Sequence, residues 1–177
     1  MPCASFTVHK GTRFVLIAAD TNVLLDLAEE VEAVTDAVSA IRERLRNARF
    51  IVPPTALHEL ALAVRDGETE RIRKTALLAL SQLRAWGFEA LNLVPVGHGI
   101  VGQIAEEIRR KDLLPTEEKN DSLIVAESAL LECRILLSGD AHLRGIDFQR
   151  LTLLLKDFDV AAPVIATPRE IVRKFCR

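Results

Sequence analysis

The chain has 177 residues, a length that favours one compact domain over two. Hydrophobic residues make up 49% and charged residues 27% of the sequence, which excludes a largely disordered chain because such chains are poor in apolar residues. Lys and Arg number 23 against 25 Asp and Glu, and this net charge of −2 excludes a strongly basic nucleic-acid coat. A nuclease with a local basic rim remains compatible with it. We therefore expect a single domain over residues 1–177, with its core at about 13–175.

No apolar run reaches the roughly 18 residues that a membrane helix needs, and the first thirteen residues lack the apolar stretch of a signal peptide. We therefore expect a cytoplasmic protein without membrane contact. Cys3, Cys133 and Cys176 are scattered and match no CxxC or Cys/His spacing, so neither a disulfide framework nor a zinc site is indicated. Cys133 lies among apolar residues and is expected to be a small buried hydrophobe.

Short apolar runs alternate with longer amphipathic stretches along the chain. Strands are predicted at residues 13–18, 50–52, 92–96, 135–137 and near Val164. Helices are predicted at about residues 23–47, after a Thr55 cap, at 68–86, 98–111 and 121–132, and after Pro168. The stretch 147–160 has no assigned place. This alternation predicts an α/β protein, a three-layer α/β/α sandwich around a central, mostly parallel sheet.

Four carboxylates fall where this pattern places the carboxyl ends of strands and the neighbouring helix starts, which is where open α/β sheets bind ligands. Asp20 follows the first strand, and Asp140 follows the strand that ends at Leu137. Glu59 lies about one turn into the helix after the second strand, and Asp121 opens the helix before the Asp140 strand. Four acids from four separate segments are thus expected at one edge.

Each acid taken singly is more often a helix cap, a turn residue or a solvated side chain. Together they would repel one another unless a cation compensates their charge. An all-oxygen donor set prefers Mg²⁺ or Mn²⁺, as one or two ions, which can lower the pKa of a water and stabilise charge on a phosphodiester. The side chains of Asn22 and Ser138 are expected to hold the carboxylates or metal-bound waters in orientation.

Four segments in the same order resemble the motifs of PIN-domain ribonucleases: AADTNVLLD (18–26), PPTALHELAL (53–62), KNDSLIVAESALLECRILLSGDAHL (119–143) and TPREIV (167–172). The resemblance extends from about residue 13 to 175. It implies a PIN-like fold and assigns metal binding to Asp20, Glu59, Asp121 and Asp140, the same acids that the strand ends select. Asn22 and Ser138 match the supporting polar positions. His142 stands where many relatives have a further acid.

Proteins of this size in the family are similar to VapC-like toxins of toxin–antitoxin pairs. The resemblance therefore implies a metal-dependent endoribonuclease that acts on single-stranded RNA and leaves a 5′-phosphate and a 3′-hydroxyl. It also implies a homodimer and inhibition by a small antitoxin protein.

Substrate binding in a slightly acidic chain requires local positive charge. Lys119, His142 and Arg144 flank Asp121 and Asp140 in sequence and are the predicted RNA-phosphate contacts, although solvated surface charge is an equally good interpretation. The chain has no tyrosine and one tryptophan, which indicates no aromatic platform for stacking bases.

Two alternatives stay open. A phosphatase of the haloacid-dehalogenase type also uses an Asp after its first strand and Mg²⁺, but its DxD pattern needs a second acid where this chain has Asn22, which cannot exchange a proton. A non-catalytic PIN-like binding module would keep the acids only as structural groups. Stabilisation of the folded protein by Mn²⁺ would speak against that module.

Overall fold

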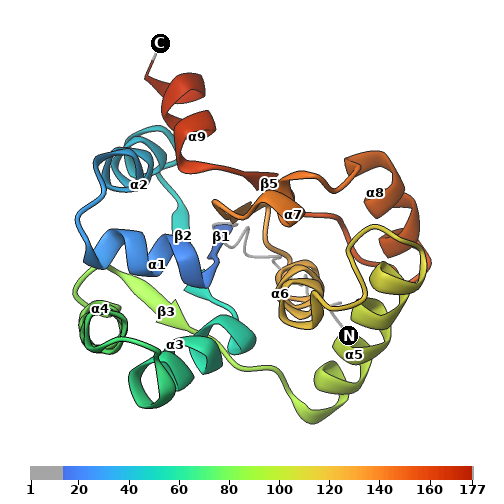
Figure 1. The fold of residues 1–177 in the computed structure, drawn as a ribbon. Helices are drawn as coiled ribbons and strands as arrows, with labels where there is room; N and C mark the ends of the chain where they lie inside the picture. Colours follow the sequence, from blue (N-terminus) through green and yellow to red (C-terminus); the bar gives the residue numbers. More distant parts are fainter. Residues whose placement is uncertain (1–13, 177) are drawn as a thin grey trace, which may run out of the picture.

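The structure is a computed structural model that describes residues 14–176. Its centre is a five-stranded sheet with the order β3-β2-β1-β4-β5, in which every neighbouring pair is parallel. Helices cover both faces of the sheet (Figure 1). The three-layer α/β/α sandwich is confirmed. The strands are β1 (Val15–Ala19), β2 (Ala48–Val52), β3 (Phe88–Ala90), β4 (Ile135–Leu137) and β5 (Val164–Ala166).

The helices fall into two layers. In Figure 1, α1, α2, α4 and α9 lie to one side of the sheet, while α5, α6 and α8 lie to the other. None of the helices within residues 14–176 has the length and apolar character needed to cross a membrane. The helices are α1 (Thr21–Ala28), α2 (Glu32–Arg44), α3 (Pro54–Asp66), α4 (Glu70–Gln82), α5 (Pro95–Arg110), α6 (Lys119–Leu130), α7 (Ala141–Arg144), α8 (Phe148–Lys156) and α9 (Pro168–Phe175).

The central strand β1 is buried between these layers and organises the sheet. Ile17 is fully buried and pairs with Phe50 of β2 on one side and with Ile135 of β4 on the other. The chain builds β2 and β3 outward from one edge of β1 and then crosses back to add β4 and β5 at the other edge. The strand order therefore reverses between β1 and β4, and the carboxyl ends at such a reversal form the usual binding crevice of an open α/β sheet.

The predicted helix over residues 23–47 is wrong in one respect, because the chain forms two helices there. α1 ends at Ala28, and Glu30 adopts a left-handed backbone conformation with φ of 56° before α2 begins. α1 buries Leu24 and Leu27, whereas α2 buries a separate stripe that includes Val38 and Ile41. The break lets each helix turn its own apolar face toward the core, and no Gly or Pro in the sequence marks it.

The strand predicted at residues 92–96 is also wrong. The third strand lies earlier, at Phe88–Ala90, where the Phe88 ring packs against Phe50 of β2 with 5.0 Å between centroids. Gly87, with φ of +71°, turns the chain from α4 into this strand, a conformation that glycine adopts without steric cost. Pro95 instead begins α5, in keeping with the preference of proline for the first helical turn.

Two smaller differences concern the start of α3 and the stretch 147–160. Thr55 does not cap α3, because Pro53 occupies the cap position and Thr55 lies inside the helix. The unassigned stretch 147–160 forms α8, which is capped by Asp147. Arg13, the predicted start of the first strand, lies outside the described residues, as does Cys3. Cys133 is buried, as expected.

Candidate active site

Asp20 is the buried centre of the site, with only 3% of its surface exposed. It follows β1 directly, and its backbone N–H still donates to the carbonyl of Leu137 at 3.0 Å, so its position is tied to the end of β4. Its Oδ2 accepts from Ser138 Oγ and Asn22 Nδ2, both at 2.6 Å, and its Oδ1 accepts from the Thr21 N–H at 2.6 Å. Burial is the main cause that raises the pKa of Asp20 from 3.8 to about 6, although the hydrogen bonds from Ser138 and the Thr21 N–H oppose the shift.

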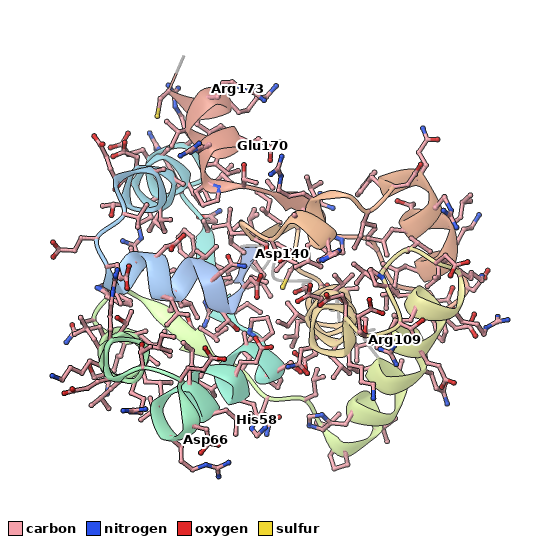
Figure 2. The ribbon with its side chains drawn as sticks, viewed as in Figure 1. His58, Asp66, Arg109, Asp140, Glu170 and Arg173 are labelled. Carbon is pink, nitrogen blue, oxygen red and sulfur yellow. The ribbon has the colours of Figure 1, made fainter. Side chains whose placement is uncertain are left out.

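The end of β4 brings Asp140 beside Asp20. Ser138 Oγ accepts from the Asp140 N–H at 3.0 Å, and Asn22 Oδ1 accepts from the Gly139 N–H at 2.9 Å, so the two strand ends are linked by side chains. Asp140 caps α7, with its Oδ1 accepting from two backbone N–H groups of that helix. Its other carboxylate oxygen makes no hydrogen bond to the described residues and is available to a ligand. Figure 2 shows Asp140 near the middle of the view, between the two helix layers.

Glu59 is held at both carboxylate oxygens by side chains from other helices. Asn120 Nδ2, at the start of α6, donates to Oε1 at 2.7 Å, and the Thr21 hydroxyl, at the start of α1, donates to Oε2. These two residues were missed by the sequence analysis. Their only signal was adjacency, because each stands directly beside a predicted ligand, Asp20 or Asp121.

Asp121 senses the charge of all the other predicted ligands. Burial, as the largest cause, and then the negative charges of Asp20, Asp140, Glu118 and Glu59, in that order, together raise its pKa from 3.8 to about 7. Glu59 and Asp140 also contribute to the raised pKa of Asp20. The four acids predicted from separate segments therefore lie within electrostatic reach of one another.

The acids have no protein cation to balance them: within residues 14–176, none of Asp20, Glu59, Asp121 and Asp140 forms an ion pair with Lys or Arg. As the side chains stand, no three His, Cys, Asp or Glu residues in the described part of the chain converge closely enough to hold an ion. A bound ion would therefore require side-chain rotation. The donor chemistry itself, one buried and three half-buried carboxylates without an ion-pair partner among the described residues, fits a hard divalent cation.

The three predicted phosphate contacts occupy different places. Lys119 is exposed at the first position of α6, one residue before Asn120. His142 is exposed, and its Nε2 lies 3.5 Å from Glu118 Oε1. Arg144 lines a groove on the α9 side of the β4 end, together with residues of α9.

A fifth acid near this edge was missed by the sequence analysis. Glu127 of α6 is 3% exposed, and its carboxylate accepts from Thr55 N at 2.9 Å and from Thr55 Oγ1 at 2.7 Å. Burial raises its pKa above the ordinary value. It joins α6 to the first turn of α3, the helix that carries Glu59. We assign it to holding these helices together, because both of its oxygens are used by Thr55.

No protein-family model matches the chain, and no match was found among curated protein sequences. Among solved structures, the chain is similar to one in the crystal structure of VapBC2 from Rickettsia felis bound to a DNA fragment from their promoter. The match has a TM-score of 0.58 at 12% sequence identity, and it covers 86% of this chain and 98% of that chain. The fold is PIN-like. At this identity the likeness establishes the fold alone.

Proposed function

We propose that the protein is a metal-dependent endoribonuclease that cleaves single-stranded RNA as the toxin of a toxin–antitoxin pair. The observation that carries the proposal is the set of four mutually repelling carboxylates at the β1–β4 reversal of a PIN-like fold, none of which has an ion-pair partner in Lys or Arg among residues 14–176. The similarity to a VapBC2 chain supports the toxin–antitoxin assignment.

The proposed ligands are Asp20, Glu59, Asp121 and Asp140, for one or two Mg²⁺ or Mn²⁺ ions. When bound, such an ion lowers the pKa of a water and stabilises negative charge on the phosphodiester. Ser138 and Asn22 keep Asp20 in one orientation, while Asn120 and Thr21 do the same for Glu59. The two backbone donors on Asp140 Oδ1 fix that carboxylate against α7.

Protons are part of this binding. Because the pKa of Asp121 is raised to about 7, a substantial share of its carboxyl groups carries a proton at neutral pH in the metal-free protein. A cation that takes this carboxylate as a ligand must displace the proton. Metal affinity is therefore expected to weaken as the pH falls below about 7.

The phosphatase alternative is disfavoured by the hydrogen bonds of Asn22. Its amide nitrogen donates to Asp20 and lies 3.3 Å from Ser138 Oγ, and its oxygen accepts from the Gly139 N–H. The residue that would have to serve as acid and base is thus an amide committed to holding two strand ends together. It can neither give up nor take a proton.

The test is cleavage of short single-stranded RNAs by the wild-type protein and by two variants. Asp20→Asn should abolish cleavage in Mg²⁺ or Mn²⁺, whereas Asp36→Asn on the exposed face of α2 makes the same chemical change away from the site and should leave cleavage unchanged. The products should carry 5′-phosphates. Wild-type rates in Asp20→Asn, or cleavage that persists in excess EDTA, would refute the metal site.

Partner binding is tested separately. As a toxin, the protein should arrest growth when it is expressed alone, and a small protein encoded beside it should bind it and relieve the arrest. We expect it to form a homodimer in the free state. If the protein neither cleaves RNA nor gains stability with Mn²⁺, it is instead a binding module with a PIN-like fold.

A further inference from the structure

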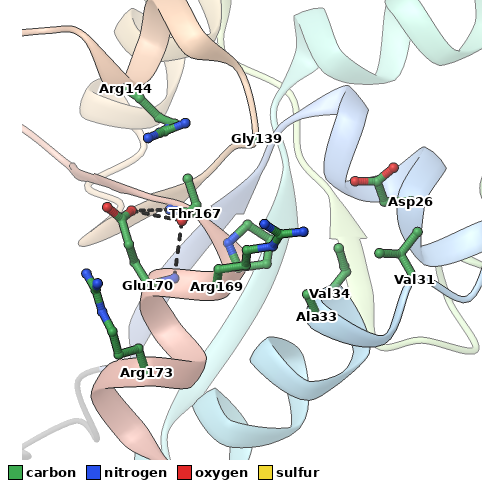
Figure 3. Close-up of a pocket in the computed structure, with 11 residues that line it drawn as sticks. Asp26, Val31, Ala33, Val34, Gly139, Arg144, Thr167, Arg169, Glu170 and Arg173 are labelled. Carbon is green, nitrogen blue, oxygen red and sulfur yellow. Dashed lines mark hydrogen bonds between the residues drawn. The ribbon is translucent and has the colours of Figure 1, made fainter.

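A groove of about 510 Å³ lies beside the candidate active site, between the α1–α2 segment and α9. Its volume is in the range of pockets that hold small molecules or parts of larger ligands. One end is formed by Gly139, the neighbour of Asp140 in the chain, whose N–H donates to Asn22. Figure 3 shows Gly139 and Arg144 on one side of this space and α9 along another. The groove therefore lies next to the candidate metal ligand Asp140.

Three arginines line this groove and carry its positive charge. Arg144 comes from α7, and Arg169 and Arg173 lie one turn apart on α9. Within residues 14–176, none of the three guanidinium groups forms an ion pair or a hydrogen bond with another side chain or carbonyl. Their donors are therefore open to a ligand. Guanidinium groups present their N–H donors in a fork that matches the oxygens of a phosphate.

The two acids in the groove do not cancel this charge. Hydrogen bonds from the Thr167 N–H and hydroxyl hold the Glu170 carboxylate at 2.8 and 2.9 Å within the capping box of its own helix. These bonds lower the pKa of Glu170, and the charges of Arg144 and Arg173 lower it further without direct contact. In Figure 3, Glu170 is turned toward Thr167, whereas Asp26 stands on the far wall. The groove thus has three guanidinium groups and two carboxylates, and the carboxylate of Glu170 is already hydrogen-bonded to Thr167.

We propose that this arginine groove, defined by Arg144, Arg169 and Arg173, binds the phosphate backbone of the RNA strand beside the cleavage site. The inference rests on the proposed nuclease function. An RNA whose scissile phosphate lies at the acids must continue away from them, and the groove provides a cationic path that starts one residue from Asp140. In the part of the chain that the structure describes, no aromatic side chain lines the groove, so the groove is suited to contact the backbone and not to stack bases.

Arg169 and Arg173 give the cleanest test because both lie on α9 and neither is next to a candidate metal ligand in the sequence. In the double variant Arg169→Gln/Arg173→Gln, two phosphate contacts are lost. The slope of log affinity against log salt should then become less steep by about 1.4, since each contact to a single strand contributes roughly 0.7. The ratio of wild-type to variant affinity should accordingly shrink about sevenfold between 50 and 200 mM salt.

Binding is measured in EDTA with two unrelated short single-stranded RNAs, and both should lose affinity equally because phosphate contacts carry no base information. The matched control is Arg84→Gln/Arg46→Gln, which removes one exposed arginine just after α4 and one from the loop before β2, neither of which lines the groove. It should bind RNA as the wild type does. Arg169→Lys/Arg173→Lys should restore most of the salt slope, since the charge returns without the fork. Melting temperatures of all variants check that they fold.

The outcomes separate this inference from the proposed function. If the wild type cleaves RNA but Arg169→Gln/Arg173→Gln matches the control in affinity and salt slope, the groove is not an RNA site and the nuclease proposal stands. If the wild type cleaves no RNA while the variant still loses RNA affinity in the expected way, the groove stands and the nuclease proposal fails. Poly-glutamate peptide is the probe for the other kind of partner. If it binds the wild type but not Arg169→Gln/Arg173→Gln, while both proteins bind RNA equally, the inference is overturned in favour of an acidic protein partner.

Discussion

The buried carboxylate of Asp20 should make the metal-free protein less stable as the pH rises. Its pKa is raised from 3.8 to about 6 in the folded state. The folded state therefore holds this proton more tightly than the unfolded state, and the associated stability is present below pH 3.8 and lost as the pH rises through about 6. A shift of this size corresponds to about 3 kcal/mol, of which about 2 kcal/mol is lost between pH 4 and 8.

Asp20→Asn removes the titrating group and so isolates this effect. All three partners of the carboxylate, Thr21, Asn22 and Ser138, donate hydrogen bonds, so an amide must turn its NH₂ toward at least one donor. That mismatch costs about 1–3 kcal/mol at every pH. The variant is therefore less stable than the wild type at pH 4. Between pH 4 and pH 8 the unfolding free energy of the wild type should fall by about 2 kcal/mol relative to that of the variant.

The measurement is urea unfolding in EDTA, followed by circular dichroism at several pH values, for the wild type, Asp20→Asn and the control Asp36→Asn. Titrating groups that do not interact with Asp20 cancel in the difference between wild type and variant, whereas Asp121, whose pKa the Asp20 charge raises, contributes to it. A difference that stays flat from pH 4 to 8 would refute the buried environment assigned to Asp20. Saturating Mn²⁺, at about 100 times its Kd, should stabilise the wild type by about 2.7 kcal/mol and the variant by much less.

Three further outcomes are expected. Ca²⁺ should support cleavage poorly, because it takes more ligands at longer distances than Mg²⁺, and equal rates in the two ions would contradict the predicted donor set. Asn120→Ala should lower Mn²⁺ affinity by about 10- to 100-fold, as measured by calorimetry, with little change in unfolding free energy, because it removes a donor that orients Glu59. Glu127→Ala should instead destabilise the fold by about 1–3 kcal/mol in urea unfolding, since the partly buried donors of Thr55 lose their acceptor; an unchanged midpoint would show that water replaces the carboxylate.

Local sequence patterns were sufficient for much of the fold. The alternation of short apolar runs with amphipathic stretches predicts a parallel sheet between helix layers, and the strand at 135–137 was placed correctly to the residue. The sequence patterns did not locate the break between α1 and α2 or the position of the third strand. The α1–α2 break at Glu30 carries no Gly or Pro, and the apolar stretch at 92–96 resembles a strand although Phe88 is the residue that packs on Phe50.

The sequence by itself indicated which acids lie near one another, because Asp20 and Asp140 come after parallel strands and Glu59 and Asp121 lie near helix starts, which places all four toward the carboxyl edge of the sheet. It could not determine what surrounds them. Thr21 and Asn120 meet Glu59 only when α1, α3 and α6 converge, and Thr55 meets Glu127 across 72 residues of chain. Arg169 and Arg173 form part of a groove wall only because α9 packs beside α2. Such contacts join segments far apart in the chain, and only the packing of the two layers onto the sheet sets their distances.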